Sequence, residues 1–141
     1  MESLNTFLTT FNQLDKTRLD LLDTLYHPDI LFTDPAHTLD GLPALKQYFA
    51  SLYDNVRFVR FIFDTQMQSG DQAFVTWTME MSHPRLAKGR PIAVNGCSHL
   101  VFASDGRVIR HRDYFDLGAM IYEHLPLLGG LITTIKKRLS P

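Results

Sequence analysis

A short stretch near the end of the chain combines an imidazole and two carboxyl groups with two aromatic rings. This stretch, "HRDYFD", covers residues 111–116. Imidazole and carboxyl groups are the side chains that most often transfer protons in enzymes. Because alternate residues of a strand share one face, His111, Asp113 and Phe115 point the same way if the stretch is extended. The stretch therefore predicts an acid–base group beside an apolar wall.

Two further acids lie far away in the chain. Asp34 follows a short extended segment, "ILFTDP", and Glu80 belongs to the strand-like run "QAFVTWTMEMS". If the fold gathers these acids with His111 and Asp113 in an apolar cavity, burial raises the pKa of a carboxyl group toward the range useful for catalysis. We expect Asp34, Glu80, His111 and Asp113 to form the catalytic set.

Each of these residues also has a structural interpretation. Asp34 precedes a proline and could cap a turn. Asp113 could bond to a neighbouring arginine or a backbone amide, and His111 could be a hydrogen-bonded core histidine. The residue types alone leave both interpretations open.

The first half of the chain has the spacing of helices. Apolar residues recur every three or four positions, which is typical of amphipathic helices. They form one stripe from Leu4 to Leu14 and a second from Leu19 to Tyr26, which His27-Pro28 ends. The segment 36–41, "AHTLDG", is typical of a loop, and a third helix is predicted to start at Leu42-Pro43 because proline is tolerated in a first turn.

The second half has the pattern of a β-sheet. Strands are predicted over residues 56–63, 72–82, 92–103 and 107–115, and the tail is predicted to form two short helices separated by Pro126 and Gly129-Gly130. Helices followed by a run of antiparallel strands predict an α+β fold. We expect one domain over residues 1–141, a cone-shaped roll whose curved, mainly antiparallel sheet carries the N-terminal helices and encloses a pocket.

The strand around Trp77 has one polar and one apolar face. Thr76, Thr78 and Glu80 alternate with Trp77 and Met79. If the polar face lines a wet cavity, the apolar face must be covered, most simply by a second copy of the chain. This interpretation predicts a homodimer packed through the face that carries Trp77 and Met79.

Composition excludes several classes of function. The chain has 141 residues and a net charge of -1, so it lacks the basic surface that nucleic-acid binding requires. No apolar run is long enough to span a membrane, and Met1-Glu2 does not begin a signal peptide. The lone Cys97 is typical of a reduced thiol, which favours the cytoplasm. No metal-ligand spacing and no phosphate-binding glycine loop occur, so we expect neither a metal nor a cofactor.

Two segments resemble a known superfamily. The strings "LYHPDILFTDP…LDGLPALKQYF" and "SDGRVIRHRDYFD", together with the order of the elements, are similar to the nuclear transport factor two-like superfamily and, within it, to SnoaL-like proteins. The resemblance covers nearly the whole chain. It implies an α+β roll with an internal pocket, on a scaffold that hosts isomerases, cyclases, hydrolases, dehydratases and non-catalytic binding modules.

Comparison with individual members narrows the chemistry that the resemblance implies. The proton-shuttling aspartate of ketosteroid isomerases falls on Asp34, but their two oxyanion donors fall on Thr10 and Ser98. Steroid isomerisation is therefore not expected, because an enolate would have little stabilisation. SnoaL-type polyketide cyclases carry a His-x-Asp pattern that resembles His111-Arg112-Asp113.

Limonene epoxide hydrolase shares the string "RDYFD", which is residues 112–116 here. Its two catalytic aspartates fall on Asp113 and Glu80. Its bridging arginine falls on Thr78, its tyrosine on Phe32 and its asparagine on Asp34. Without the arginine, two buried carboxylates lose the charge that would hold them ionised and aligned.

These observations lead to two functional hypotheses. In the first, the protein binds a small hydrophobic molecule and performs acid–base catalysis without a cofactor, with Asp113 transferring the proton and His111 orienting it. In the second, the protein is a non-catalytic ligand-binding or regulatory module. In both, the expected ligand contacts are Phe32, His37, Thr78, Tyr26 and Phe115.

Overall fold

Helices and strands follow one another along the chain much as the sequence predicts. The computed structural model describes residues 2–120 and 126–140. Its helical segments are α1 (Glu2–Phe11), η1 (Leu19–Leu21), α2 (Leu22–Leu25), α3 (Leu42–Asn55), η2 (Ala87–Gly89), α4 (Leu117–Met120) and α5 (Pro126–Arg138). Its strands are β1 (Tyr26–Thr33), β2 (Thr38–Asp40), β3 (Phe58–Ser69), β4 (Gln72–Ser82), β5 (Ile92–Phe102) and β6 (Val108–Phe115).

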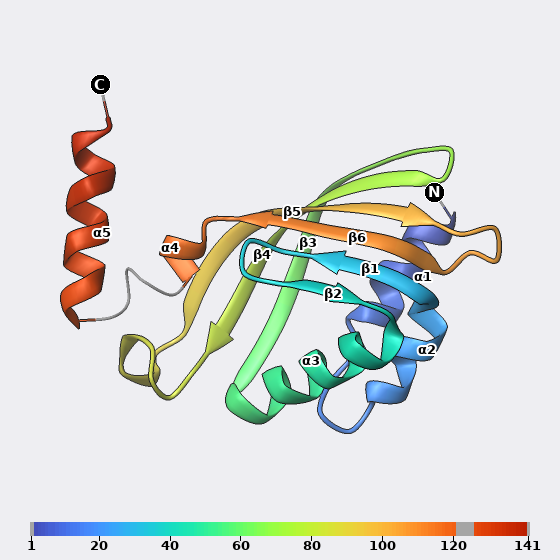
Figure 1. Cartoon of the computed structure of the whole chain (residues 1–141), viewed down its shortest axis with the longest axis horizontal. Helices are drawn as coiled ribbons and strands as arrows, with labels where there is room; N and C mark the ends of the chain where they lie inside the picture. Colours follow the sequence, from blue (N-terminus) through green and yellow to red (C-terminus); the bar gives the residue numbers. More distant parts are fainter. Residues whose placement is uncertain (1, 121–125, 141) are drawn as a thin grey trace.

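The six strands form one curved sheet in the order β2-β1-β6-β5-β4-β3. Neighbouring strands are antiparallel except for β1 and β6, which run parallel. Helices α1, α2 and α3 lie on one side of this sheet (Figure 1). The prediction of an α+β roll with a mainly antiparallel sheet is confirmed.

The hydrophobic core lies between these helices and the inner face of the sheet. The predicted stripe of α1 is buried there, with Leu4 fully buried and Phe11 against Phe61. Leu45 and Phe49 bury the inner side of α3, which begins at the predicted Leu42-Pro43. Packing of apolar helix faces against one sheet face produces a single core.

Two local predictions in the first half are wrong. The second helix ends at Leu25, because Tyr26 begins β1 and pairs with Val108 of β6. Pro28 is accommodated where the pairing of β1 with β6 is interrupted, between Tyr26 and Leu31. The predicted loop 36–41 contains β2, which pairs with the end of β1 and forms the edge of the sheet.

The orientation of β4 is opposite to the predicted one. Its apolar face points inward, and Trp77 and Met79 are only 4% and 8% exposed in the single chain. The helices bury their apolar stripes by packing on an apolar sheet face, which leaves the polar face outside. The predicted dimer contact through Trp77 and Met79 is therefore wrong, because the chain's own core covers both residues.

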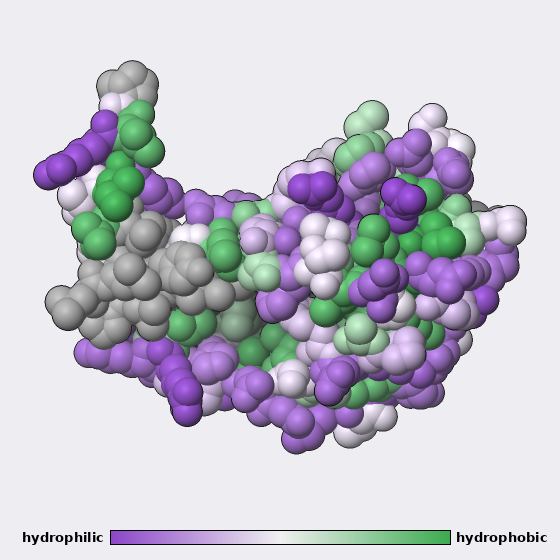
Figure 2. Space-filling view, viewed as in Figure 1, coloured by the Kyte–Doolittle hydropathy of each residue, from purple (hydrophilic) through white to green (hydrophobic). Residues whose placement is uncertain are grey.

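The tail forms α4 and α5, and the predicted break at Gly129-Gly130 lies inside α5. The helix starts instead at Pro126, which is tolerated in a first turn; the predicted first tail helix extends into residues 121–125, outside the described residues. Leu131 and Ile135 are exposed on α5, as is Leu139 directly after it, and Figure 2 shows apolar surface along one side of this helix. No helix in the described ranges 2–120 and 126–140 has the length and apolar character needed to cross a membrane.

Candidate functional site

A cavity of about 120 Å³ lies between α3 and the inner face of the sheet. Asp34, His111 and Asp113 line it together with many aromatic side chains. Its remaining lining residues are Phe11, Phe32, Ala36, His37, Tyr48, Phe49, Leu52, Tyr53, Val59, Phe61, Trp77, Met79, Met81 and Phe115. The cavity is thus mostly apolar, with polar groups gathered near the ends of two strands.

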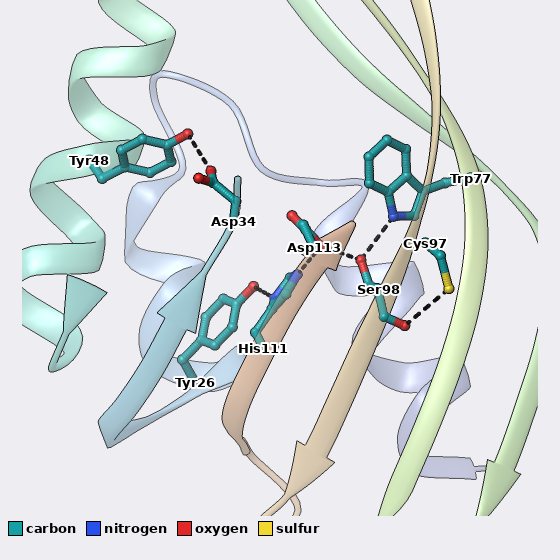
Figure 3. A network of polar contacts seen from close by, with 8 residues as sticks. All are labelled: Tyr26, Asp34, Tyr48, Trp77, Cys97, Ser98, His111 and Asp113. Atoms are coloured by element: carbon teal, nitrogen blue, oxygen red, sulfur yellow. Dashed lines mark hydrogen bonds and ion pairs between the residues drawn. The ribbon is translucent and has the colours of Figure 1, made fainter. Parts of the chain in front are cut away.

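The parallel pairing of β1 with β6 brings Asp34 next to Asp113. Phe32 pairs with His111 and Thr33 with Arg112, so the next positions along the two strands are Asp34 and Asp113. Because side chains alternate between faces, the positions two residues after the inward Phe32 and His111 point inward as well. Figure 3 shows the two carboxyl groups on the same side of the sheet.

The carboxyl group of Asp113 is held through one of its oxygens. Ser98, directly opposite on β5, donates its hydroxyl hydrogen to Oδ1 at 2.5 Å. Nε2 of His111 lies 2.7 Å from the same oxygen. No hydrogen bond from the described residues reaches Oδ2, although the Asp113 side chain lines the cavity and is only 15% exposed. One oxygen is thus anchored, and the other is available to a bound molecule.

Tyr26 fixes the protonation pattern of His111. The Tyr26 hydroxyl lies 2.8 Å from Nδ1 of the buried imidazole (Figure 3). Burial raises the pKa of the Tyr26 phenol well above its usual value, and the charge of Asp113 adds to the shift. The phenol therefore keeps its hydrogen, and Nδ1 is the only acceptor for that hydrogen among the described residues. Donation to Nδ1 leaves the imidazole proton on Nε2, the nitrogen facing Asp113.

Trp77 completes this chain of donors on the other side. Its indole Nε1–H donates to the Ser98 hydroxyl at 2.8 Å, which leaves the hydroxyl hydrogen for Asp113. The ring can lie over β5 because the residue paired with Trp77 is Gly96, where an added Cβ would overlap the ring. The hydrogen bonds from Tyr26 through His111 and from Trp77 through Ser98 therefore both run toward Oδ1 of Asp113.

Asp34 both caps a turn, which was its predicted structural role, and lines the cavity. Its Oδ1 accepts hydrogen bonds from the backbone N–H groups of Ala36 and His37, which is the expected turn cap. Its side chain is nevertheless only 4% exposed and lines the cavity. The ring of His37 lies 3.1 Å from Oδ1, and the Tyr48 hydroxyl donates to Oδ2 at a long 3.5 Å.

Comparison with known proteins identifies the family. The SnoaL-like domain profile matches residues 5–111, which is well over half of the chain. The chain belongs to the SnoaL-like domain family. Among curated proteins, none matches it.

Solved structures with the same fold are numerous but distant in sequence. An NTF2-like protein of unknown function from Burkholderia pseudomallei is 19% identical, with a TM-score of 0.73 over 86% of this chain and 93% of that one. A ketosteroid isomerase-like protein from Catenulispora acidiphila, in complex with trimethylamine, is 18% identical, with a TM-score of 0.74 over 85% and 93%. TsrD from Streptomyces laurentii is 20% identical, with a TM-score of 0.71 over 84% and 92%. At these identities the similarity shows the fold alone.

The SnoaL-like domain does not bring all of the predicted site residues to the cavity. Phe32, His37 and Phe115 line it, as do three of the four predicted catalytic residues. Glu80 does not: it lies on the outer face of β4 and pairs with Arg60 at 2.8 Å. Its alternation with the inward Met79 and Met81 dictates this orientation.

Two of the predicted ligand contacts are also misplaced. Thr78 points outward with Glu80, and its hydroxyl donates to Asn95. Tyr26 is fully buried behind His111 and supports the imidazole instead of lining the cavity. Sequence reasoning missed Ser98 as a partner of Asp113, although a serine in the apolar run of β5 was an available signal.

Within the described parts of the chain, no group of three or more His, Cys, Asp or Glu side chains is arranged to hold a metal ion. Both ring nitrogens of His111 and Oδ1 of Asp113 take part in hydrogen bonds within the protein, while Oδ2 of Asp113 has no partner among the described residues. The arrangement is that of an oriented carboxyl group at an apolar cavity.

The buried tyrosines predict a loss of stability in alkali. Burial also raises the pKa of the Tyr48 phenol, helped by the charges of Asp34 and Asp113. Above pH 10, the usual pKa of tyrosine, the unfolded chain therefore loses protons that the folded chain keeps. We expect the free energy of unfolding to be unaffected by these groups below pH 10 and to fall above it, by about 1.4 kcal/mol per pH unit for each such tyrosine.

Urea unfolding between pH 9 and pH 11 measures this decline. Tyr26→Phe should make the decline shallower, since phenylalanine has no proton to lose. An equally steep decline in Tyr26→Phe and Tyr48→Phe would contradict the assignment.

Proposed function

We propose that this SnoaL-like domain binds a small, mainly apolar molecule in the cavity and that Asp113 transfers a proton to or from it. Asp113 acts as the acid–base group, and His111 and Ser98 position it. No cofactor takes part in the proposed step. Asp34, next to Asp113 and directly after β1, and Tyr48, on α3, are further polar groups that line the cavity.

One observation carries this proposal. Oδ1 of Asp113 accepts two hydrogen bonds from fixed donors, while Oδ2 has no partner among the described residues. A carboxyl group held in this way is oriented before a molecule binds, and orientation is a large part of the advantage of a catalytic group. The complex of the Catenulispora protein with trimethylamine supports a small-molecule site on this fold.

A different observation favours a non-catalytic ligand-binding module. No lysine or arginine lines the cavity within the described residues. Enzymes that remove a proton next to a carbonyl group use preorganised donors or cations to stabilise the negative charge that develops. A protein that only binds its ligand needs no such group.

Hydrogen–deuterium exchange at carbon separates the two functions. Small ketones and cyclic imines would be incubated with the protein in D₂O, and the signals of the protons next to the C=O or C=N carbon would be followed by NMR. Catalysed exchange of any of these compounds, abolished in Asp113→Asn, supports proton transfer. Binding detected through Trp77 fluorescence without faster exchange favours the binding module.

We also propose that the homodimer expected from the sequence forms through the outer face of the sheet. Ile62, Phe74 and Tyr114 are about half exposed there, and a second copy would cover them. Sedimentation equilibrium should show a dimer that Phe74→Glu combined with Ile62→Glu converts to a monomer. Arg85→Glu, in an exposed loop, is the control and should remain dimeric. A dimer that survives the double substitution would contradict this contact.

A further inference from the structure

The ionisable groups around the cavity leave a negative charge without a cationic partner. Asp34 has the imidazole of His37 beside it, at the exposed rim. Among the described residues, the hydrogen-bond partners of Asp113 are Ser98 and His111. Because Nδ1 of His111 accepts from Tyr26, the imidazole is a neutral donor. A carboxylate that faces an apolar volume without a counter-charge is unfavourable, because little water remains to solvate it.

The walls of the cavity suit a positive charge. Eight of the described lining residues are aromatic, among them Phe32, Tyr48, Trp77 and Phe115. The face of an aromatic ring carries partial negative charge and attracts cations, most strongly where water is excluded. The rings differ in orientation: Phe61 is nearly perpendicular to Trp77, and Phe32 is tilted against Tyr48. The cavity is therefore lined by aromatic rings in several orientations.

We propose that the cavity binds a small organic monocation, an ammonium or iminium ion with apolar substituents, with its charge beside Asp113. This inference deepens the proposed function and uses the same site. A cavity of about 150 Å³ holds benzene, so the volume of about 120 Å³ encloses roughly five non-hydrogen atoms. Further atoms of a ligand would extend toward the exposed rim at His37. The charge would lie at the carboxylate and the substituents would contact the rings.

A cationic ligand also agrees with the absence of lysine and arginine from the described lining residues. When Asp113 removes a proton from a cation, the substrate becomes neutral and the carboxylate becomes a neutral carboxylic acid. For an iminium ion, the C–H electron pair moves into a C=C bond and the C=N pair moves to nitrogen, which gives an enamine. No unpaired negative charge develops, so no oxyanion donor is needed.

Choline and 3,3-dimethylbutan-1-ol provide the test. They have the same shape and number of non-hydrogen atoms, but only choline is charged, and its quaternary nitrogen cannot lose a proton. Binding would be measured by calorimetry and by the fluorescence of Trp77, which is the chain's sole tryptophan and lines the cavity. We expect choline to bind about tenfold more tightly than the alcohol.

Asp113→Asn should remove this preference and leave the binding of the alcohol nearly unchanged. Glu80→Gln removes a carboxylate from the outer face and is the matched control, which should keep the preference for choline. Equal or tighter binding of the alcohol to the unmodified protein would overturn the inference, and so would the failure of both compounds to bind at millimolar concentrations. The comparison in the unmodified protein needs no variant.

The two proposals fail separately. Selective binding of choline without proton exchange in any carbon acid leaves the cation site standing and contradicts the proposed catalysis. Proton exchange in neutral ketones without selectivity for choline contradicts the cation site and supports the catalysis.

Discussion

Asp113→Asn is expected to lower the rate of proton exchange by a factor of about 10² to 10⁴, the range over which a positioned acid–base group contributes to catalysis. The asparagine amide keeps an oxygen that can accept from Ser98 and His111, so the anchoring of the side chain survives. It lacks the second carboxylate oxygen that would take up the proton. We therefore expect the thermal midpoint of unfolding to change little while turnover is lost.

Glu80→Gln is the control for this experiment, since it makes the same chemical change on the other face of the sheet. Glu80 pairs with Arg60 at the surface, where an ion pair contributes about 0 to 1 kcal/mol. Exchange rates in this variant should equal those of the unmodified protein. Unchanged exchange in Asp113→Asn would remove Asp113 from the mechanism and direct attention to Asp34.

The roles of the positioning residues can be separated from that of Asp113. Ser98→Ala and His111→Phe each remove one donor from Oδ1 but leave the carboxylate in place. Because orientation weakens while the reacting group remains, we expect partial losses of rate in both variants, together with a shift of the pH profile.

The local part of the site could be predicted from the sequence. A strand has a period of two residues, which places His111, Asp113 and Phe115 on one face whatever the rest of the fold does. The structure confirms that all three line the cavity. The approach of Asp34 to Asp113 came from the family resemblance, because no local pattern shows that β1 and β6 are parallel neighbours.

The wrong orientation of Glu80 has a simple physical origin. Alternation along β4 shows which residues share a face but does not say which face is inside. Because the polar face was assigned to the cavity, Trp77 and Met79 were predicted to lie outside and to contact a partner chain. The helices, however, need an apolar surface, and burying Trp77 and Met79 beneath them stabilises the single chain without a second copy.

Ser98 and Gly96 could not be assigned from the sequence because their importance depends on register. Ser98 acts on Asp113 because the two are paired across β5 and β6. Gly96 matters because it is paired with Trp77 across β4 and β5. A shift of one residue in either pairing would move each side chain to the opposite face.

Gly96→Ala is therefore expected to have a large effect for so small a change. The added methyl group would overlap Cη2, Cζ2 and Cζ3 of the Trp77 ring, which is buried and cannot move without disturbing its neighbours. Inserting a methyl group into a packed core costs about 1 to 3 kcal/mol. We also expect proton exchange to fall, because a displaced indole no longer donates to Ser98. Urea unfolding and Trp77 fluorescence measure the two effects.

Gly130→Ala is the matched control, since nothing lies within 4 Å of an added Cβ at this position in α5. Alanine is a better helix former than glycine, so this variant should be as stable as the unmodified protein or more stable, by up to about 1 kcal/mol.

Combining Gly96→Ala with Trp77→Phe should recover part of the lost stability, because a smaller ring makes room for the methyl group. It should not restore exchange, because phenylalanine has no N–H to donate to Ser98. A Gly96→Ala variant of full stability and unaltered Trp77 fluorescence would show that the indole does not lie on β5. It would also contradict the hydrogen bond from Trp77 to Ser98, and with it the role of Trp77 in holding Asp113.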